Sequence, residues 1–256
     1  MSSRAIGLAA LTVLELPAHE QVSAAAQAGY SHVGLRLIPV TGQTLPVFDE
    51  AQVKRRLDET GVAVLDVEIF RLDAHTDVSA FEPTLALAQR LGASEILVHG
   101  ADPEEARLVQ SFGELCELAQ RHGLAANLEP MPWVEVSNVA KAKRIIAAAG
   151  KRNAALLVDA IHFYRTDNEL EELRGVPHRY MQLCDAHPGR PMQMQELIRQ
   201  ARGDRLFPGE GALDLKSLMR ALPSHLPISV ETPIARKMDA YERAKRALEA
   251  TTRLLG

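Results

Sequence analysis

Residues 95–130, EILVHGADPEEARLVQSFGELCELAQRHGLAANLEP, contain one complete strand–helix–strand unit. The two ends, EILVHG and LAANLEP, are short runs of apolar residues, whereas residues 104–123 between them carry apolar side chains at helical spacing. Gly123 closes the helical segment just before the second strand, where a left-handed helix end is favoured. Apolar strands that alternate with helices in this way are typical of a parallel sheet covered on both faces.

The same unit recurs along the rest of the chain. Strands are predicted at residues 5–11, 32–38, 62–70, 95–100, 124–130, 154–160, 180–186 and 227–233. Most successive strands are about 30 residues apart, a fair size for one β/α unit. No Gly/Ser linker or charge block divides the chain, so we expect an α/β fold with one domain over residues 1–256, a (β/α)8 TIM barrel. A doubly wound open sheet is the second possibility, but it requires a Gly-rich fingerprint that is missing after the first strand.

Glycines and one long interval mark the ends of these units. Helical segments are expected to end at Gly29, Gly61, Gly92, Gly123 and Gly150. The interval between the last two strands is the longest and carries an additional helix. It also contains RLFPGEGALDL, residues 205–215, whose Pro-Gly and Gly residues indicate a long loop. A long loop in a barrel is more often functional than idle.

The composition argues against several classes of protein. A net charge of −4 and a pI near 6.2 disfavour nucleic-acid binding, and no run of 18 apolar residues predicts a membrane span. The apolar run after Arg4 resembles a signal peptide, but Glu15 closes it and no small-residue cleavage site follows. Cys116 and Cys184 lack C-x-x-C spacing and are expected to be buried free thiols. These features favour a cytoplasmic protein.

Oxygen-bearing side chains lie in the last four predicted strands. They are Glu129, Asp159, Gln182 and Glu231. In TIM barrels the active site is built at the carboxyl ends of the strands, so these side chains are expected to converge. A single Asp or Glu there commonly caps a helix or pairs with a basic residue. Three carboxylates at one barrel mouth would repel each other without a cation, so the set favours a divalent metal ion.

In the order and spacing of its motifs, the chain resembles the xylose-isomerase-like superfamily of TIM barrels, the sugar phosphate isomerase/epimerase family. The resemblance covers nearly the whole chain and rests on AAAQAGYSHVGLRL (24–37), LEP (128–130), VDAIH (158–162), QLCDA (182–186), RLFPGEGALDL (205–215) and SVETP (229–233). The family's metal ligands are Glu, Asp, His and Glu, which correspond to Glu129, Asp159, Gln182 and Glu231. Gln182 replaces the usual His and makes the set oxygen-based, which favours one Mg²⁺ or Mn²⁺ ion, with Co²⁺ or Zn²⁺ as alternatives.

The resemblance implies further roles around the metal. Glu129 and Glu231 are expected to act as base and acid on the two sides of the reacting carbon. His162 is expected to reach the substrate or to orient a ligand, and Asp185 to support the strand-seven ligand. Substrate contacts are expected from residues at the barrel mouth: Arg205, Glu68, His99, Arg36 and Arg71.

The activity implied by the resemblance is a divalent-metal-dependent isomerase or epimerase that enolises a sugar, sugar phosphate or related α-hydroxycarbonyl substrate. Loss of a β-hydroxyl after the same proton abstraction gives dehydration, so a lyase similar to 3-dehydroshikimate dehydratase is the alternative, and Gln182 resembles some dehydratase branches. A non-catalytic sugar-binding barrel is disfavoured because the ligand set is intact. The endonuclease IV branch is disfavoured because it has a His-rich three-metal site. A homodimer or homotetramer is expected from the resemblance.

Overall fold

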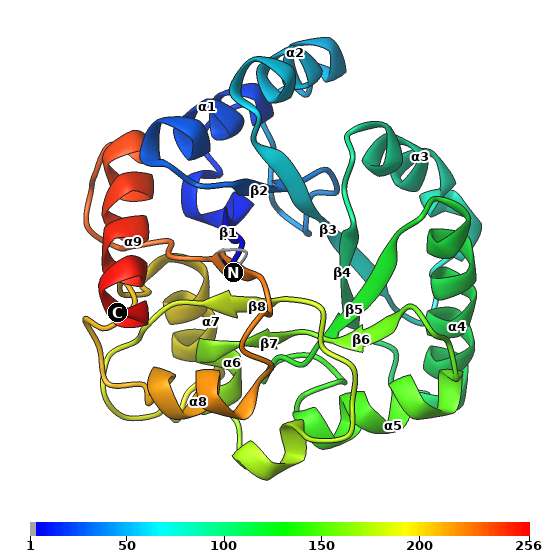
Figure 1. The fold of residues 1–256 in the computed structure, drawn as a ribbon. Helices are drawn as coiled ribbons and strands as arrows, with labels where there is room; N and C mark the ends of the chain where they lie inside the picture. The colour runs from blue at the N-terminus through cyan, green and yellow to red at the C-terminus, as the bar shows by residue number, and fades with distance from the viewer. Residues whose placement is uncertain (1–3) are drawn as a thin grey trace.

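The computed structural model describes residues 4–256, which form a ring of parallel strands surrounded by helices (Figure 1). The strands are β1 (Ile6–Leu8), β2 (His32–Arg36), β3 (Ala63–Leu72), β4 (Glu95–Gly100), β5 (Ala125–Glu129), β6 (Ala154–Leu156), β7 (Val158–Asp159), β8 (Met181–Leu183) and β9 (Ile228–Val230). Their order in the sheet is β6-β5-β4-β3-β2-β1-β9-β8-β7. The expected domain 1–256 includes residues 1–3, which lie outside the described residues.

The ring closes through the split strand formed by β6 and β7. These two strands are separated by Leu157 alone, and β6 pairs with β5 while β7 pairs with β8. The Leu157 N–H donates to the carbonyl of Leu128 at 3.0 Å, which continues the contact with β5. The nine observed strands therefore correspond to the eight predicted ones, and the predicted TIM barrel is confirmed.

Helices cover the outside of the ring. They are α1 (Ala18–Ala28), α2 (Glu50–Thr60), α3 (Glu82–Arg90), α4 (Glu105–Arg121), α5 (Val139–Ala149), α6 (Ala160–Tyr164), α7 (Met194–Gly203), α8 (Leu215–Ala221) and α9 (Ala240–Leu255), with 3-10 turns η1 (Ala10–Val13), η2 (Val78–Phe81) and η3 (Leu170–Leu173). All five glycines predicted at helix ends have positive φ, between 62° and 97°. Cys116 and Cys184 are buried free thiols, as predicted. Among residues 4–256, no helix combines the length and the hydropathy that a membrane crossing requires.

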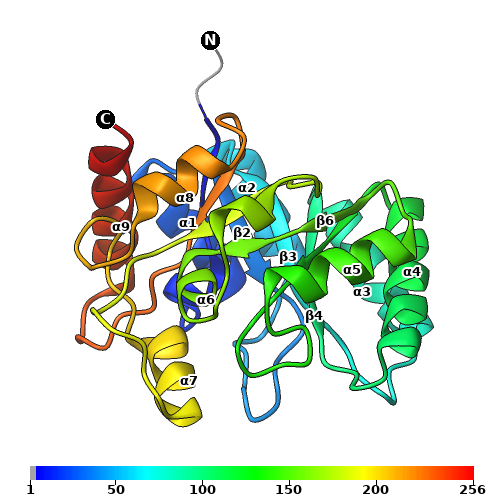
Figure 2. The same ribbon diagram turned by 90° about the horizontal axis from the view of Figure 1, so that it is seen from below.

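The loops at one end of the ring build the mouth of the barrel. Figure 2 shows that the loops after β2 and β5 and the helix α7 project from the same end, opposite to the C-terminus. This end carries the carboxyl ends of the strands, where β5 finishes at Glu129 and β7 at Asp159. The interval between β8 and β9 contains two helices, α7 and α8, joined by the predicted loop that begins at Arg205. The fold therefore brings the sequence motifs to one end of the barrel.

Candidate metal centre at the barrel mouth

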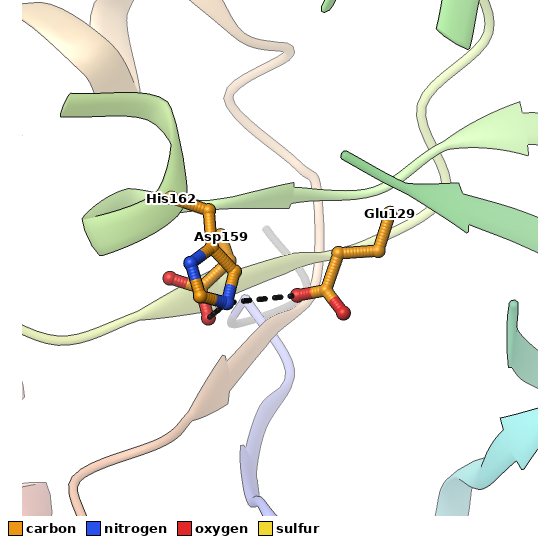
Figure 3. A group of neighbouring side chains, drawn as sticks. All are labelled: Glu129, Asp159 and His162. Carbon is orange, nitrogen blue, oxygen red and sulfur yellow. Dashed lines mark ion pairs between the residues drawn. The ribbon is translucent and has the colours of Figure 1, made fainter. Parts of the chain in front are cut away.

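Glu129, Asp159 and His162 form a compact group of buried donors (Figure 3). One atom from each side chain lies within 4.8 Å of one atom from each of the others. The Nε2 atom of His162 is 3.8 Å from Oε1 of Glu129 and 3.8 Å from Oδ2 of Asp159. A buried site with two carboxylates and one imidazole has the donor types that divalent metal ions take. We refer to Glu129, Asp159 and His162 as the metal cluster.

The turn from β7 into α6 fixes the position of His162. Asp159 caps α6, because its Oδ1 accepts a hydrogen bond from the Ile161 N–H at 2.9 Å. His162 follows one helical turn later and packs edge-on against Trp133, with ring centroids 4.9 Å apart. Burial lowers the pKa of His162 to about 4, so the imidazole is neutral near pH 7 and keeps a lone pair for a ligand.

Arg205 links the metal cluster to Glu231. Its guanidinium lies 2.7 Å from Oδ2 of Asp159 and 2.7 Å from Oε2 of Glu231, and its Nε donates to the carbonyl of Ala201 at 2.6 Å. Only 2% of its surface is exposed. Arg205, which the resemblance places at the substrate, therefore has most of its donors engaged by the protein. The Arg205 guanidinium is the positive partner of both buried carboxylates, Asp159 and Glu231.

Gln182 is the Cα partner of Asp159 in the parallel register of β7 and β8, and its side chain carries an unpaired oxygen. Its Nε2 donates to Oε1 of Glu231 at 3.0 Å, whereas its Oε1 is buried and has no hydrogen-bond partner among residues 4–256. An unpaired buried amide oxygen is costly, and a cation would satisfy it. The residue types present thus fit a divalent ion held by Glu129, Asp159, His162 and the Gln182 oxygen. Glu231, predicted as the fourth ligand, pairs here with Gln182 and Arg205.

The carboxylates of this centre have different protonation behaviour. Burial, followed by the negative charges of Asp159 and Glu231, holds the pKa of Glu129 well above its usual range. Burial also raises the pKa of Glu231 to about 8, although Arg205 opposes the shift. At Asp159 burial acts in the same upward direction, but Arg205 and His162 outweigh it and leave its pKa below the usual value. The centre therefore combines one firmly ionised carboxylate with two that take up a proton more readily.

A cavity of about 720 Å³ opens above the metal cluster. Its wall includes Glu129 and His162, together with all five side chains predicted to contact substrate: Arg36, Glu68, Arg71, His99 and Arg205. Arg202 also lines the cavity and was not predicted from the sequence. Its position in the last turn of α7, three residues before Arg205, is the only local signal that it faces the mouth.

Besides Arg205, three of the predicted substrate contacts are paired with protein groups: Arg36, Glu68 and His99. Arg36 lies 2.9 Å from Oε1 of Glu68, and both side chains are almost completely buried. They neutralise each other on the cavity wall. His99 Nε2 lies 2.8 Å from Oε2 of Glu129, so His99 positions a member of the metal cluster. Burial lowers the pKa of His99 well below its usual value, which keeps this ring neutral.

Asp185 orders the long loop after α7. Its carboxylate accepts hydrogen bonds from the backbone N–H groups of Ala186 at 2.8 Å, Leu213 at 3.0 Å and Gly209 at 3.1 Å. Within the described part of the chain no hydrogen bond joins it to Gln182. The support that the resemblance assigns to Asp185 is therefore given to the loop rather than to the strand-seven donor.

Gly211 leaves no room for a side chain in this loop. A Cβ atom there would overlap the backbone oxygen of Ala186 and the carboxylate of Asp185. We expect Gly211→Ala to lower the free energy of unfolding by about 1–3 kcal/mol, measured by urea denaturation. Gly203→Ala is the control, because nothing lies within 4 Å of a Cβ at Gly203. Equal stabilities of the two variants would contradict the close approach.

The family model described as Xylose isomerase-like TIM barrel matches residues 22–254. The chain belongs to this family. Membership in the xylose isomerase-like barrels agrees with the resemblance found in the sequence motifs and with the closed parallel ring of strands. The metal cluster lies at the carboxyl ends of β5 and β7, and folds of this kind carry their active sites at that end of the barrel.

Two curated relatives of this xylose isomerase-like barrel align with about half of the chain. The 3-dehydroshikimate dehydratase of Pseudomonas aeruginosa is 28% identical over 142 residues, which are 52% of this chain and 22% of that protein. The inosose isomerase of Bacillus velezensis is 28% identical over 145 residues, 54% of this chain and 51% of that protein. The chain thus spans about half or less of the length of these relatives.

A solved structure supports the fold. The crystal structure of the IOLI protein with a binding zinc atom superposes with a TM-score of 0.79 and covers 98% of both chains at 18% identity. Likeness at this level of identity concerns the arrangement of strands and helices. It shows that nearly all of the chain follows one known barrel architecture.

Proposed function

We propose that this protein is a divalent-metal-dependent isomerase or epimerase that removes a proton next to the carbonyl of a small α-hydroxycarbonyl substrate. The observation that carries the proposal is the buried metal cluster, two of whose members, Glu129 and His162, face a cavity large enough for a sugar-sized molecule. The names of the inosose isomerases among its relatives support the same class of reaction.

The side chains supply the proton transfer. A divalent ion held by the metal cluster and Gln182 would polarise a carbonyl and acidify the neighbouring C–H. Glu231 and Glu129 both line the cavity and have raised pKa values, so one can accept the proton and the other can return one. Arg205 keeps Asp159 ionised. His99 holds Glu129 in place.

Hydrogen exchange with solvent tests this proposal. Inososes, ketoses, ketose phosphates and cyclic keto acids are incubated in D₂O with the protein and Mg²⁺ and followed by proton NMR. An isomerase or epimerase incorporates deuterium at the carbon next to the carbonyl, with no loss of water from the product. Exchange should stop when a chelator removes the metal ion from the protein and should return when Mg²⁺ is added. No exchange with any of these compounds would contradict the enolisation chemistry and favour the sugar-binding alternative.

Dehydration is a second candidate, and Gln182 is the observation that favours it. A Gln at this position resembles some dehydratase branches of the superfamily, and a 3-dehydroshikimate dehydratase is among the relatives. Both reactions begin with the same proton abstraction. In the dehydration a β-hydroxyl then leaves as water, whereas in isomerisation or epimerisation a proton returns to carbon. In the same samples, a dehydratase yields an unsaturated product with near-ultraviolet absorbance and a mass lower by one water. A product that keeps all of its oxygen atoms, with its mass changed only by the deuterium taken up, excludes dehydration.

The ion is proposed to be Mg²⁺ or Mn²⁺, because three oxygen donors accompany one imidazole. Changing Gln182 to His adds a second imidazole, so we expect ion binding to persist but its preference to shift toward Zn²⁺ or Co²⁺. Competition titrations of the metal-free protein with these ions measure the order of their affinities. Gln182→Leu is the control, because it removes the oxygen without adding a donor and should weaken the binding of all four ions. An unchanged order in Gln182→His would show that Gln182 does not contact the metal.

A further inference from the structure

Four arginines line the cavity, and they differ in whether their charge is already matched. Arg205 lies between two buried carboxylates, and Arg36 is paired with Glu68 inside the wall. These two are neutralised by partners that are themselves almost inaccessible to solvent. The other two arginines of the cavity, Arg71 and Arg202, have no buried carboxylate as a partner among the described residues.

Arg71 lies at the end of β3 and lines the same cavity as Glu129 and His162. In the parallel register its Cα partner on β4 is His99, the residue that contacts Glu129. Half of the Arg71 side chain is exposed, and its nearest carboxylate, Asp73, is 3.7 Å away, beyond hydrogen-bond length. The other oxygen of Asp73, Oδ1, accepts hydrogen bonds from the His75 N–H at 3.0 Å and from the Thr76 hydroxyl at 3.2 Å. The fork of Arg71 is thus open toward the cavity.

Arg202 approaches from a different side, on the helix α7 that projects at the mouth (Figure 2). Its side chain makes no hydrogen bond or ion pair with any residue of the described range 4–256. Arg199, one turn earlier on the same helix, is paired with Glu196 and Asp204 at 2.7 Å each. The difference is informative, because carboxylates are available near α7 and yet Arg202 is turned to the cavity instead.

We propose that Arg71 and Arg202 select a substrate that carries an anionic group, a carboxylate or a phosphate, in addition to its hydroxycarbonyl. The proposal rests on the proposed function, because it assigns the substrate class of the same cavity. The guanidinium fork binds carboxylate and phosphate oxygens in bidentate fashion, and two cations that line the same cavity and have no buried partner attract an anion. Since β2, β1 and β9 separate β3 from β8, an anion between the two arginines receives donors from two sides.

Two matched pairs of probes test the substrate class by isothermal titration calorimetry on the full chain with Mg²⁺. The carboxylate arm compares 3-dehydroshikimate with its neutral methyl ester, and the phosphate arm compares D-fructose 6-phosphate with D-fructose. We expect the anion of at least one pair to bind about 10-fold or more tightly than its neutral partner, because the neutral partner cannot form the charge-assisted bidentate contact. The arm that shows the difference identifies the anion.

Single and double substitutions attribute the difference to the two arginines. Arg71→Gln and Arg202→Gln should each lower the affinity for the anionic probe about 10-fold. The double variant should bind the anionic and the neutral member of the pair with similar affinity. Arg202→Lys keeps the charge without the fork and should fall between the wild type and Arg202→Gln. Arg55→Gln, an exposed arginine on α2 outside the cavity, is the control and should change neither affinity.

Binding and turnover separate this proposal from the proposed function. Equal affinity for both members in both arms, or a difference that survives in the double variant, would overturn the anion selectivity even if deuterium exchange proceeds. A difference that disappears in the double variant supports the anion selectivity even if no probe exchanges hydrogen with D₂O. For a probe that is turned over, the substitutions should raise KM and leave kcat within about 3-fold, because the anionic group lies away from the reacting carbon.

Discussion

Changing Glu129 to Ala is expected to abolish metal uptake and turnover together. Glu129 belongs to the metal cluster, lines the cavity and has a raised pKa, so its loss removes a metal donor and a proton-transfer group at once. Loss of groups that only orient a metal ligand typically costs about 10–100-fold, and loss of the donor itself should exceed that range. Elemental analysis of the purified variant and deuterium exchange measure the two effects.

Glu135→Ala is the matched control for this substitution. Glu135 lies in the loop after the same strand, and its side chain is exposed. The control should retain its metal and its activity. Circular dichroism and urea denaturation check that Glu129→Ala is folded, and Glu129→Gln, which keeps the shape of the side chain, should still lose activity. Full metal content together with normal turnover in Glu129→Ala would rule out the proposed centre.

Changing Arg205 to Met should strongly destabilise the metal-free protein. The buried guanidinium is the positive partner of Asp159 and Glu231, and removing it leaves two buried carboxylates uncompensated. Removing one partner of a buried ion pair typically costs about 3–5 kcal/mol, and we expect a loss of that size in urea denaturation. Mn²⁺ or Mg²⁺ should recover part of this loss, because a cation in the metal cluster replaces some of the missing charge.

Arg199→Met serves as the control for Arg205. Arg199 also pairs with two carboxylates, but its side chain is about half exposed, and such surface pairs contribute about 0–1 kcal/mol. The two variants carry the same Arg→Met substitution, so the difference between their free energies of unfolding reports the difference between a buried and an exposed ion pair. If Arg205→Met costs no more than Arg199→Met, the carboxylates do not depend on this guanidinium. If added metal has no effect on Arg205→Met, the link between Arg205 and the metal centre fails.

The strands of the barrel could be predicted because their signal is local. A strand buried on both faces needs a short continuous apolar run, and each such run is visible in the sequence without knowledge of its neighbours. The break at Leu157 could not be predicted in this way, because AALLVDA reads as one uninterrupted strand. The break depends on the fit to two different neighbours, β5 on one side and β8 on the other.

The donors of the candidate site were predictable for a related reason. Charged residues inside an apolar strand are expensive unless they are matched, so Glu129 and Asp159 stand out in the sequence by themselves. Arg202 gives no such signal, since an arginine in the last turn of a helix is usually solvated. Asp185 was expected next to the strand-seven donor, whereas its hydrogen bonds go to the loop around Gly209.

By itself the sequence determined the class of fold, the end of the barrel that carries the site and the carboxylates gathered there. Each of these follows from properties of single segments: apolar runs, helix ends and polar residues at strand ends. Only the tertiary structure decided which charges neutralise each other. Arg205 meets Asp159 and Glu231, and Arg36 meets Glu68, while Arg71 and Arg202 stay open to the cavity. The physical reason is that electrostatic pairing depends on distances between groups on different strands, and the closure of the barrel sets those distances.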